Sequence, residues 1–134
     1  MAKLSEIEGI GAASVEKLAA CGCKNQAQLL DMCGKAAGRK KLAADSGISP
    51  KLILKWTNRA DLARVKGIGE EYADLLEASG VDSVPELAQR KPENLHAKMV
   101  EVNEAKKLVR GLPGLGQVEK WVAAAKDMPR AVHH

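Results

Sequence analysis

Aromatic residues are almost absent from the chain. Its 134 residues include no Phe, one Tyr and two Trp. A hydrophobic core must therefore be built from Leu, Val, Ile and Ala. Hydrophobic residues make up 46% of the sequence, which is enough for one packed domain or two small units. The shortage of aromatic rings also argues against a protein that binds single strands by stacking bases on side chains.

Long apolar runs are missing as well. No stretch approaches the roughly 20 residues that a bilayer-spanning helix needs, and the first residues lack the basic and apolar regions of a secretory signal. Cys21, Cys23 and Cys33 are an odd number of thiols, which is a poor basis for a disulfide framework and suits a reducing compartment. We therefore expect a cytoplasmic protein with no membrane partner.

Patterns typical of enzymes and metal sites are also lacking. The sequence contains no phosphate-binding Gly-Lys-Ser/Thr loop, no dinucleotide fingerprint and no recognisable hydrolytic triad. Three thiols are one ligand short of a structural zinc site, and the histidines at 96, 133 and 134 are distant in sequence. We expect no enzymatic activity, no cofactor, no bound metal and no small-molecule substrate.

An internal repeat is the strongest positive signal. Segment 4–11, LSEIEGIG, recurs as segment 62–69, LARVKGIG, and the match continues at the same spacing. Leu18, Gly22 and Leu29 correspond in this way to Leu76, Gly80 and Leu87. The repeat predicts a duplicated unit, with a first part over residues 1–58 that includes basic connecting helices and a second part over residues 59–130 that includes C-terminal helices.

The expected fold is all-α, because Ala, Leu, Glu and Lys abound and no segment alternates like a strand. In each repeat a helix should end before a glycine, and a third helix should follow a capping residue, Asn25 or Ser83. Pro50 and Pro92 are typical first residues of helices, and Asn103 is a candidate cap for another. The remaining expected helices cover about residues 34–44 and 115–126, and Gly114–Gly116 is interpreted as a turn.

Each repeat contains the pattern hydrophobic-x-Gly-hydrophobic-Gly followed by a helix. Two tandem helix-hairpin-helix motifs, at 7–18 and 65–76, are therefore predicted. Glycines allow a tight turn between helices and leave the amides of the second helix exposed, where the helix dipole favours a phosphate. We further expect the two repeats to share one aliphatic core and to bury Ile10 and Ile68 equally.

Positive charge is concentrated in the middle of the chain. The net charge is +4, yet residues 35–66 contain nine Lys or Arg against two Asp. The helix that begins at Pro50 should carry a basic stripe on one face and Leu52, Ile53 and Trp56 on another. Arg39, Lys40 and Lys41 could extend the stripe. The candidate nucleic-acid-binding residues are Gly9, Gly11, Lys51, Lys55, Arg59, Arg64, Lys66, Gly67 and Gly69.

Acidic residues near the hairpins support a different interpretation. Glu70 and Glu71 follow the second hairpin directly, and Glu6 and Glu8 flank the first. They would repel a phosphate, although glutamate also suits the first turn of a helix. Two functions therefore stay open. One is non-sequence-specific binding of duplex DNA through backbone amides and the basic stripe. The other is docking of an unidentified protein partner, with the hairpins serving only as scaffolding.

A family resemblance covers nearly the whole chain. Segment 60–72, ADLARVKGIGEEY, and its continuation through residue 87 resemble a bacterial family of unknown function that is grouped with the helix-hairpin-helix superfamily. Segments 7–11, 47–56, 94–96, 102–104 and 117–121 carry the resemblance further. It implies an all-helical fold and a tendency to bind nucleic acid, but it brings no activity with it.

Overall fold

The computed structural model describes residues 3–7 and 9–133, except for the side chain of Glu70. Glu8, the Glu70 side chain and His134 thus lie outside the described part. The fold is all-helical, as predicted. The described residues form η1 (Leu4–Glu6), α1 (Ala12–Ala20), α2 (Gln26–Cys33), α3 (Ala36–Ser46), α4 (Pro50–Leu62), α5 (Glu70–Ala78), α6 (Val84–Ala88), α7 (Pro92–Lys106) and α8 (Leu115–Asp127). No strand is present among them, and none of their helices is both long and apolar enough to cross a membrane.

Contacts along the chain define two compact units. Unit 1 comprises Met1–Asp61 together with Ala131–His134, and unit 2 comprises Leu62–Arg130. The buried hydrophobic side chains fall into two clusters that follow this division. The expectation of one shared aliphatic core is therefore wrong, because each unit has enough Leu, Ile and Val side chains to form a core of its own.

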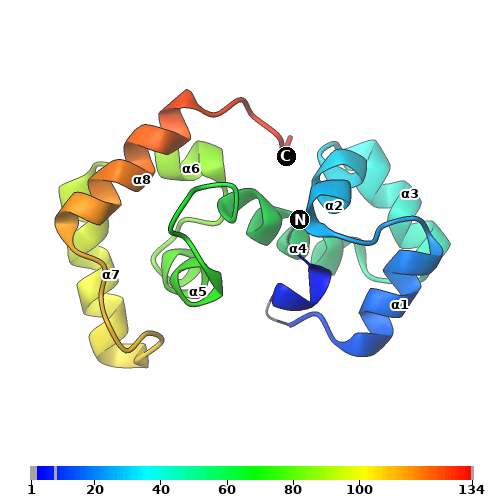
Figure 1. Cartoon of the computed structure of the whole chain (residues 1–134), viewed down its shortest axis with the longest axis horizontal. Helices are drawn as coiled ribbons and strands as arrows, with labels where there is room; N and C mark the ends of the chain where they lie inside the picture. The colour runs from blue at the N-terminus through cyan, green and yellow to red at the C-terminus, as the bar shows by residue number, and fades with distance from the viewer. Residues whose placement is uncertain (1–2, 8, 134) are drawn as a thin grey trace. The chain divides into compact units, whose positions relative to one another are not determined.

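In unit 1, α3 packs against α1 and α2, and η1 packs against α1 (Figure 1). The core consists mainly of aliphatic side chains, and its one large ring is that of Trp56, which is 2% exposed. Leu18, Leu29 and Ile53 are completely buried in it. These residues occupy the apolar faces that the helical spacing of the sequence predicts.

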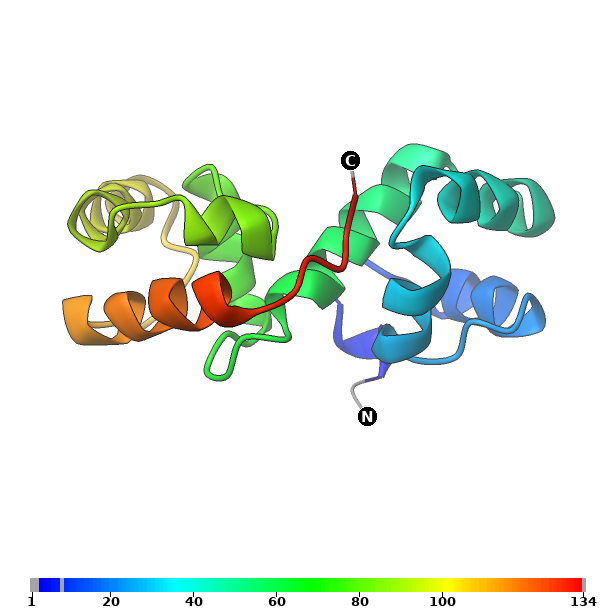
Figure 2. The ribbon, with the colours of Figure 1, turned by 90° about the horizontal axis from the view of Figure 1, so that it is seen from above.

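In unit 2, α8 packs against both α6 and α7, and α5 packs against α7. In Figure 2, α7 is viewed nearly along its axis, next to α8, which is seen from the side. Trp121 on α8 is 2% exposed and lies among Leu75, Leu87 and Met99 in this core. Both tryptophans are therefore core residues, as the place of Trp56 on an apolar helix face predicts.

The two repeats have the same backbone where α1 and α5 end. The Cys23 amide donates to the Leu18 carbonyl at 2.9 Å, and the Val81 amide donates to the Leu76 carbonyl at 2.8 Å. The intervening Gly22 and Gly80 have φ angles of +90° and +96°. This is the Schellman arrangement, in which a left-handed residue lets the chain bond back onto the last turn. The repeat in sequence is thus a repeat in local structure.

The next helices begin differently in the two repeats. The Asn25 side chain accepts a hydrogen bond from the Gln28 amide at 2.8 Å, so the predicted cap of α2 is confirmed. The Ser83 side chain makes no such bond to α6, so the predicted cap is wrong there. A capping oxygen accepts from the second or third amide of the helix, and Pro85 removes the first of these two donors.

Asn103 closes a loop instead of starting a helix. α7 continues through Asn103 to Lys106, which overturns the predicted helix boundary. The Asn103 side chain accepts from the Val109 amide at 3.0 Å and donates to the Val109 carbonyl at 3.2 Å. These two bonds hold the chain after Lys107, which ends the helix with φ +50°. An Asn can bond forward or backward along the chain, and only the folded structure selects between these.

Candidate nucleic-acid interface

The first glycine turn, Gly9–Gly11, is open. Gly9 has φ +90°, and the Ile10 amide donates to the Ile7 carbonyl at 3.2 Å. Gly11 precedes α1 in an extended conformation and has no side chain with which to cap the helix. Ala12 and the rest of the first turn bring no acidic residue, and no described atom lies within 4 Å of a Cβ added at either glycine. The amides that begin α1 are therefore available to an anion.

The second glycine turn, Gly67–Gly69, has the same backbone but is partly covered. Gly67 has φ +94°, and the Ile68 amide donates to the Val65 carbonyl at 3.2 Å. A Cβ added at Gly67 would lie 3.1 Å from Trp121 Nε1 and 3.5 Å from Gln117 Nε2, both on α8. The second turn therefore packs against α8, whereas the first has no comparable neighbour.

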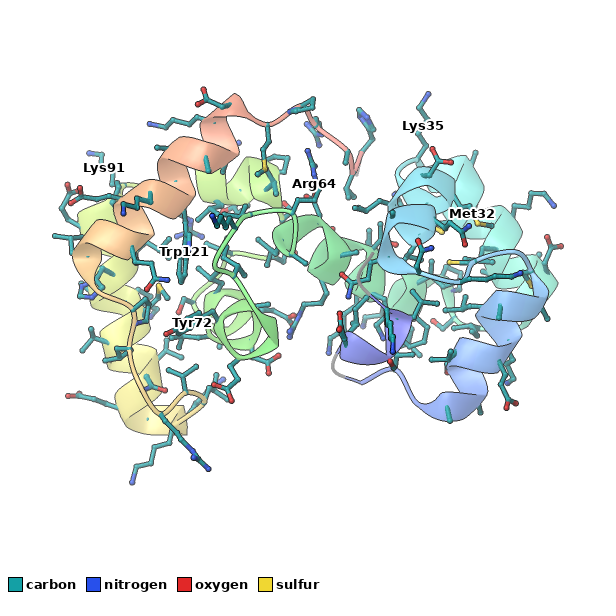
Figure 3. The ribbon with its side chains drawn as sticks, in the orientation of Figure 1. Met32, Lys35, Arg64, Tyr72, Lys91 and Trp121 are labelled. Carbon is teal, nitrogen blue, oxygen red and sulfur yellow. The ribbon has the colours of Figure 1, made fainter. Side chains whose placement is uncertain are left out.

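The aromatic ring beside this turn belongs to the same packing. Tyr72 on α5 and Trp121 on α8 have ring centroids 5.3 Å apart at an interplanar angle of 55° (Figure 3). Such a tilted pair stabilises the contact between the two helices. Glu71, in the first turn of α5, is exposed. The geometry of the second turn thus serves helix packing, and an exposed acidic residue, Glu71, follows it.

Ile10 and Ile68 are not buried equally, so that expectation is wrong. Ile68 is 5% exposed and belongs to the core of unit 2. Ile10 is half-buried and packs only at the margin of the core of unit 1. Ile68 lies in the core beside the turn that α8 covers, whereas Ile10, in the open turn, is partly exposed to solvent.

The basic stripe on α4 is confirmed in part. Lys51 and Lys55 are exposed, and Ile53 and Trp56 on the same helix are buried. Arg59 is half-buried and already engaged in an interaction. Leu52 is 45% exposed, so its assignment to the apolar face is wrong. The exposed part of the stripe is therefore its N-terminal portion.

The other predicted cations differ in accessibility. Lys66 is exposed, whereas Arg64 is half-buried and its Nη2 donates to the Pro129 carbonyl at 2.7 Å (Figure 3). Arg39 is 7% exposed and binds three backbone carbonyls, so it does not extend the stripe. Lys41 is exposed and pairs with Asp45 at 2.9 Å. Arg64 and Arg39 therefore have structural contacts, while Lys66 faces solvent.

The net charge divides unevenly between the two units. Unit 1 contains ten Lys or Arg and six Asp or Glu, whereas unit 2 contains eleven of each. The whole formal charge of +4 therefore belongs to unit 1. The open glycine turn and the exposed lysines of α4 are in this same unit. Long-range attraction of a polyanion would thus act mainly on unit 1.

The cysteines belong to no candidate metal site in the part of the chain that the structure describes. Among the described residues, no three His, Cys, Asp or Glu side chains are grouped so as to hold a metal ion. Burial raises the pKa of the Cys23 thiol from 9.0 to about 11, with smaller contributions from Cys33 and Cys21. Burial also raises the pKa of Cys33. Both thiols are therefore protonated near neutral pH and behave as small apolar core residues.

We expect this burial to show in thiol reactivity. In the folded protein at pH 8, iodoacetamide should modify half-buried Cys21 first and leave Cys23 and Cys33 unmodified, since alkylation requires an exposed thiolate. Mass spectrometry of peptides from native and urea-treated samples measures this. Rapid modification of Cys23 in the native state would contradict its burial.

The raised pKa of Cys23 also affects the stability of the protein. A thiol with a raised pKa favours folding only while it is protonated, so the contribution of Cys23 to the free energy of unfolding should be lost as pH rises from about 9 to 11.

Sequence reasoning missed the role of Arg39, which belongs to a contact with the end of the chain. A signal was present, because Gly34 and Gly38 lie four residues apart beside it. Gly34 lies in the bend between α2 and α3, and Gly38 lies on α3; an added Cβ would overlap the backbone of Ala131 at the first and of Met32 at the second. Glycine often marks such a close approach of backbone. Because Lys40 and Lys41 follow it, Arg39 was interpreted as part of a charged surface instead.

Taken together, the fold is that of an all-helical protein with two repeated helical units, each containing a glycine turn before a helix. The chain belongs to the family described as a domain of unknown function, DUF4332, whose model matches residues 8–128. No curated protein and no solved structure matches the chain.

Proposed function

We propose that the protein binds duplex DNA without sequence specificity and that unit 1 makes the principal contacts. In this proposal the two glycine turns are helix-hairpin-helix motifs, and the protein acts in the cytoplasm without catalysing a reaction. The observation that carries the proposal is the open turn at Gly9–Gly11. It presents uncapped helix amides with no acidic residue in the first turn, on the unit that holds the entire net charge.

The contacts expected on DNA are of two kinds. The amides that begin α1 would receive one phosphate, because unsatisfied N–H groups and the helix dipole act together there. Lys51 and Lys55 would neutralise further phosphates by charge alone. Neither kind of contact reads base edges, so the binding is expected to be independent of sequence. The second turn contributes less, because α8 lies against Gly67 and glutamates follow Gly69.

A double substitution in the first turn of α1 tests the hairpin directly. We expect Ala12→Glu with Ala13→Glu to lower DNA affinity by about tenfold or more at 50 mM salt, because two carboxylates would then stand at the anion site. The substitution copies the acidic start of α5. Acidic residues favour the first turn of a helix, so α1 should be no less stable. Fluorescence anisotropy with a labelled 20-base-pair duplex measures the affinity.

A matched control separates this effect from general charge. Ala36 and Ala37 are exposed and occupy the first turn of α3 in the same unit. Ala36→Glu with Ala37→Glu brings the same charge to an equivalent helix position without touching the glycine turn. We expect a smaller loss from this variant. An equal loss in both variants would show that only net charge matters and that the first turn has no special part.

A second candidate function, docking of a protein partner, is favoured by the loop between α7 and α8. Leu108, Leu112 and Leu115 are 37–40% exposed there, although large apolar side chains usually turn inward. Two side-chain contacts fix the backbone of the loop. Tyr72 Oη donates to the Gly111 carbonyl at 3.3 Å, and His96 Nε2 lies 3.0 Å from the Pro113 carbonyl. If the wild type binds neither DNA nor RNA at about 50 mM salt, where electrostatic contacts are strong, docking of a protein partner through this loop becomes the better account of the function.

A further inference from the structure

Exposed leucines are concentrated in the connection between α7 and α8. Among the described residues, four large apolar side chains are more than a third exposed, those of Leu52, Leu108, Leu112 and Leu115. The last three lie within a stretch of eight residues in unit 2. A single exposed leucine is common on a protein surface, whereas several in one short segment indicate a surface that binds a partner.

The backbone of this connection is fixed against α7. The Asn103 side chain, near the end of α7, bonds to the amide of Val109 at 3.0 Å and to its carbonyl at 3.2 Å. His96, near the start of α7, has its Nε2 3.0 Å from the Pro113 carbonyl. The segment therefore runs back along the helix before α8 begins (Figure 1). Its leucines are exposed although its backbone is held in place.

The inward positions of the segment are already occupied. Val109 is 7% exposed and belongs to the core of unit 2, and Pro113 is buried as well. Neighbouring residues of an extended chain point to opposite sides, so Leu108 and Leu112, which precede these two residues, face solvent. The apolar surface thus exists before a partner arrives, which lowers the entropic cost of binding.

Positive charge accompanies these leucines. Lys106, Lys107 and Arg110 are exposed, and no carboxylate in the described part of the chain forms an ion pair with any of them. Residues 105–118 contain these three cations and no Asp or Glu. We call residues 106–115, with the three cations and the three leucines, the leucine loop.

The positive charge is confined to this loop. Unit 2 contains eleven basic and eleven acidic residues, and three of the basic ones are in the loop, so eight basic residues face eleven acidic ones in the rest of the unit. Nucleic acid or an anionic bilayer is a long polyanion that would also meet this acidic remainder, and phosphate offers the leucines no apolar contact. A short acidic segment of a protein can contact the loop alone.

We infer that the leucine loop binds an amphipathic helix of a protein partner that carries apolar side chains on one face and Asp or Glu beside them. The apolar face covers the leucines, and the carboxylates pair with Lys106, Lys107 and Arg110. The inference rests on the second candidate function, docking of a protein partner, and specifies the chemistry of that partner. Three leucines are few for a standard interface, so the complex should be weak.

A peptide titration with the full chain tests this inference. The probe is a synthetic helix of about 18 residues, with leucine at every third or fourth position and glutamate beside it. A second peptide has glutamine in place of each glutamate. Three surface ion pairs together correspond to about tenfold in affinity, so the glutamate peptide should bind more tightly by that factor at low salt. Fluorescence anisotropy of the labelled peptides measures the affinities.

Two leucine variants locate the binding on the loop. Leu112→Ser should weaken binding of the glutamate peptide about fivefold, because less than half of this side chain remains to be buried by a partner. Leu52→Ser, at a leucine of unit 1 that is 45% exposed, should leave the affinity for the peptide unchanged. Leu112→Ser should also leave duplex DNA binding unchanged. An equal loss of DNA and peptide affinity would assign the loop to the DNA interface and overturn the inference.

A pair of charge variants tests the choice of an acidic partner. Lys106→Glu with Arg110→Glu should lower the affinity for the glutamate peptide about tenfold and leave that for the glutamine peptide nearly unchanged. Lys120→Glu with Lys126→Glu makes the same change of charge on α8 of the same unit and should have a smaller effect.

The outcomes separate this inference from the function on which it rests. Equal affinity for the two peptides would overturn the acidic partner, while docking of a protein through the loop would stand. Absence of binding to both peptides at about 1 mM would overturn both. Binding to vesicles with about 30% phosphatidylserine, lost in Leu112→Ser and seen without peptide binding, would make a lipid surface the occupant and overturn the inference.

Discussion

Replacing Lys51 and Lys55 together by glutamate should weaken duplex DNA binding by about tenfold or more at low salt. Each phosphate contact contributes roughly 0.9 to the slope of log affinity against log salt on B-DNA. Loss of two contacts should therefore flatten this slope by roughly 1.8, and charge reversal adds repulsion. Anisotropy titrations between 50 and 200 mM salt measure both quantities.

Replacement of Lys51 and Lys55 by glutamate should leave the fold intact. Both lysines are exposed, and the core contacts of α4 come from Ile53 and Trp56 on another face. A control with the same change of charge is Lys120→Glu with Lys126→Glu, two exposed positions on α8 of unit 2. We expect the control to retain most of the affinity and nearly all of the salt dependence. If both pairs flatten the slope equally, the DNA contacts are not concentrated on α4.

Gly67→Thr should destabilise the protein more than the same substitution at the other glycines of the two turns. Gly67 has φ +94°, a region that a β-branched residue adopts only with strain, and the added Cβ would come 3.1 Å from Trp121 Nε1. Backbone strain of this kind costs on the order of 1–3 kcal/mol, and displacement of Trp121 adds to it. Urea denaturation, followed by tryptophan fluorescence, measures the free energy of unfolding.

Gly69→Thr is the matched control two residues away. Gly69 has φ −92° and ψ −174°, and no described atom lies within 4 Å of an added Cβ. Threonine and glycine are about equally suited to the residue before a helix, so the change should be small. Gly9→Thr falls between the two, because φ is +90° but the space around it is open. Equal losses at positions 67 and 69 would show that the left-handed conformation is not what requires glycine.

Much of the local structure was predictable because its causes are local. The repeat in segments 4–11 and 62–69 predicted two equivalent turns, and the φ angles of Gly9 and Gly67 agree within a few degrees. Asn25, Pro50 and Pro92 begin their helices as their side chains dictate. Two predicted caps failed. The Ser83 side chain makes no bond to α6, although only one of its two usual donors is removed by Pro85, and the Asn103 side chain bonds to Val109 beyond the end of α7.

The sequence by itself determined the all-helical fold, the duplicated turns and the concentration of charge before residue 67, because spacing, glycine and proline act within a few residues. The tertiary structure alone decided which turn stays open. Trp121 and Gln117 lie more than 45 residues from Gly67 in the chain, yet they cover it, while no described residue covers Gly9 in this way. It also decided that Arg39 binds the backbone of His133, since that contact joins residues 94 positions apart. Neighbours so distant in sequence are chosen by core packing, which no local pattern encodes.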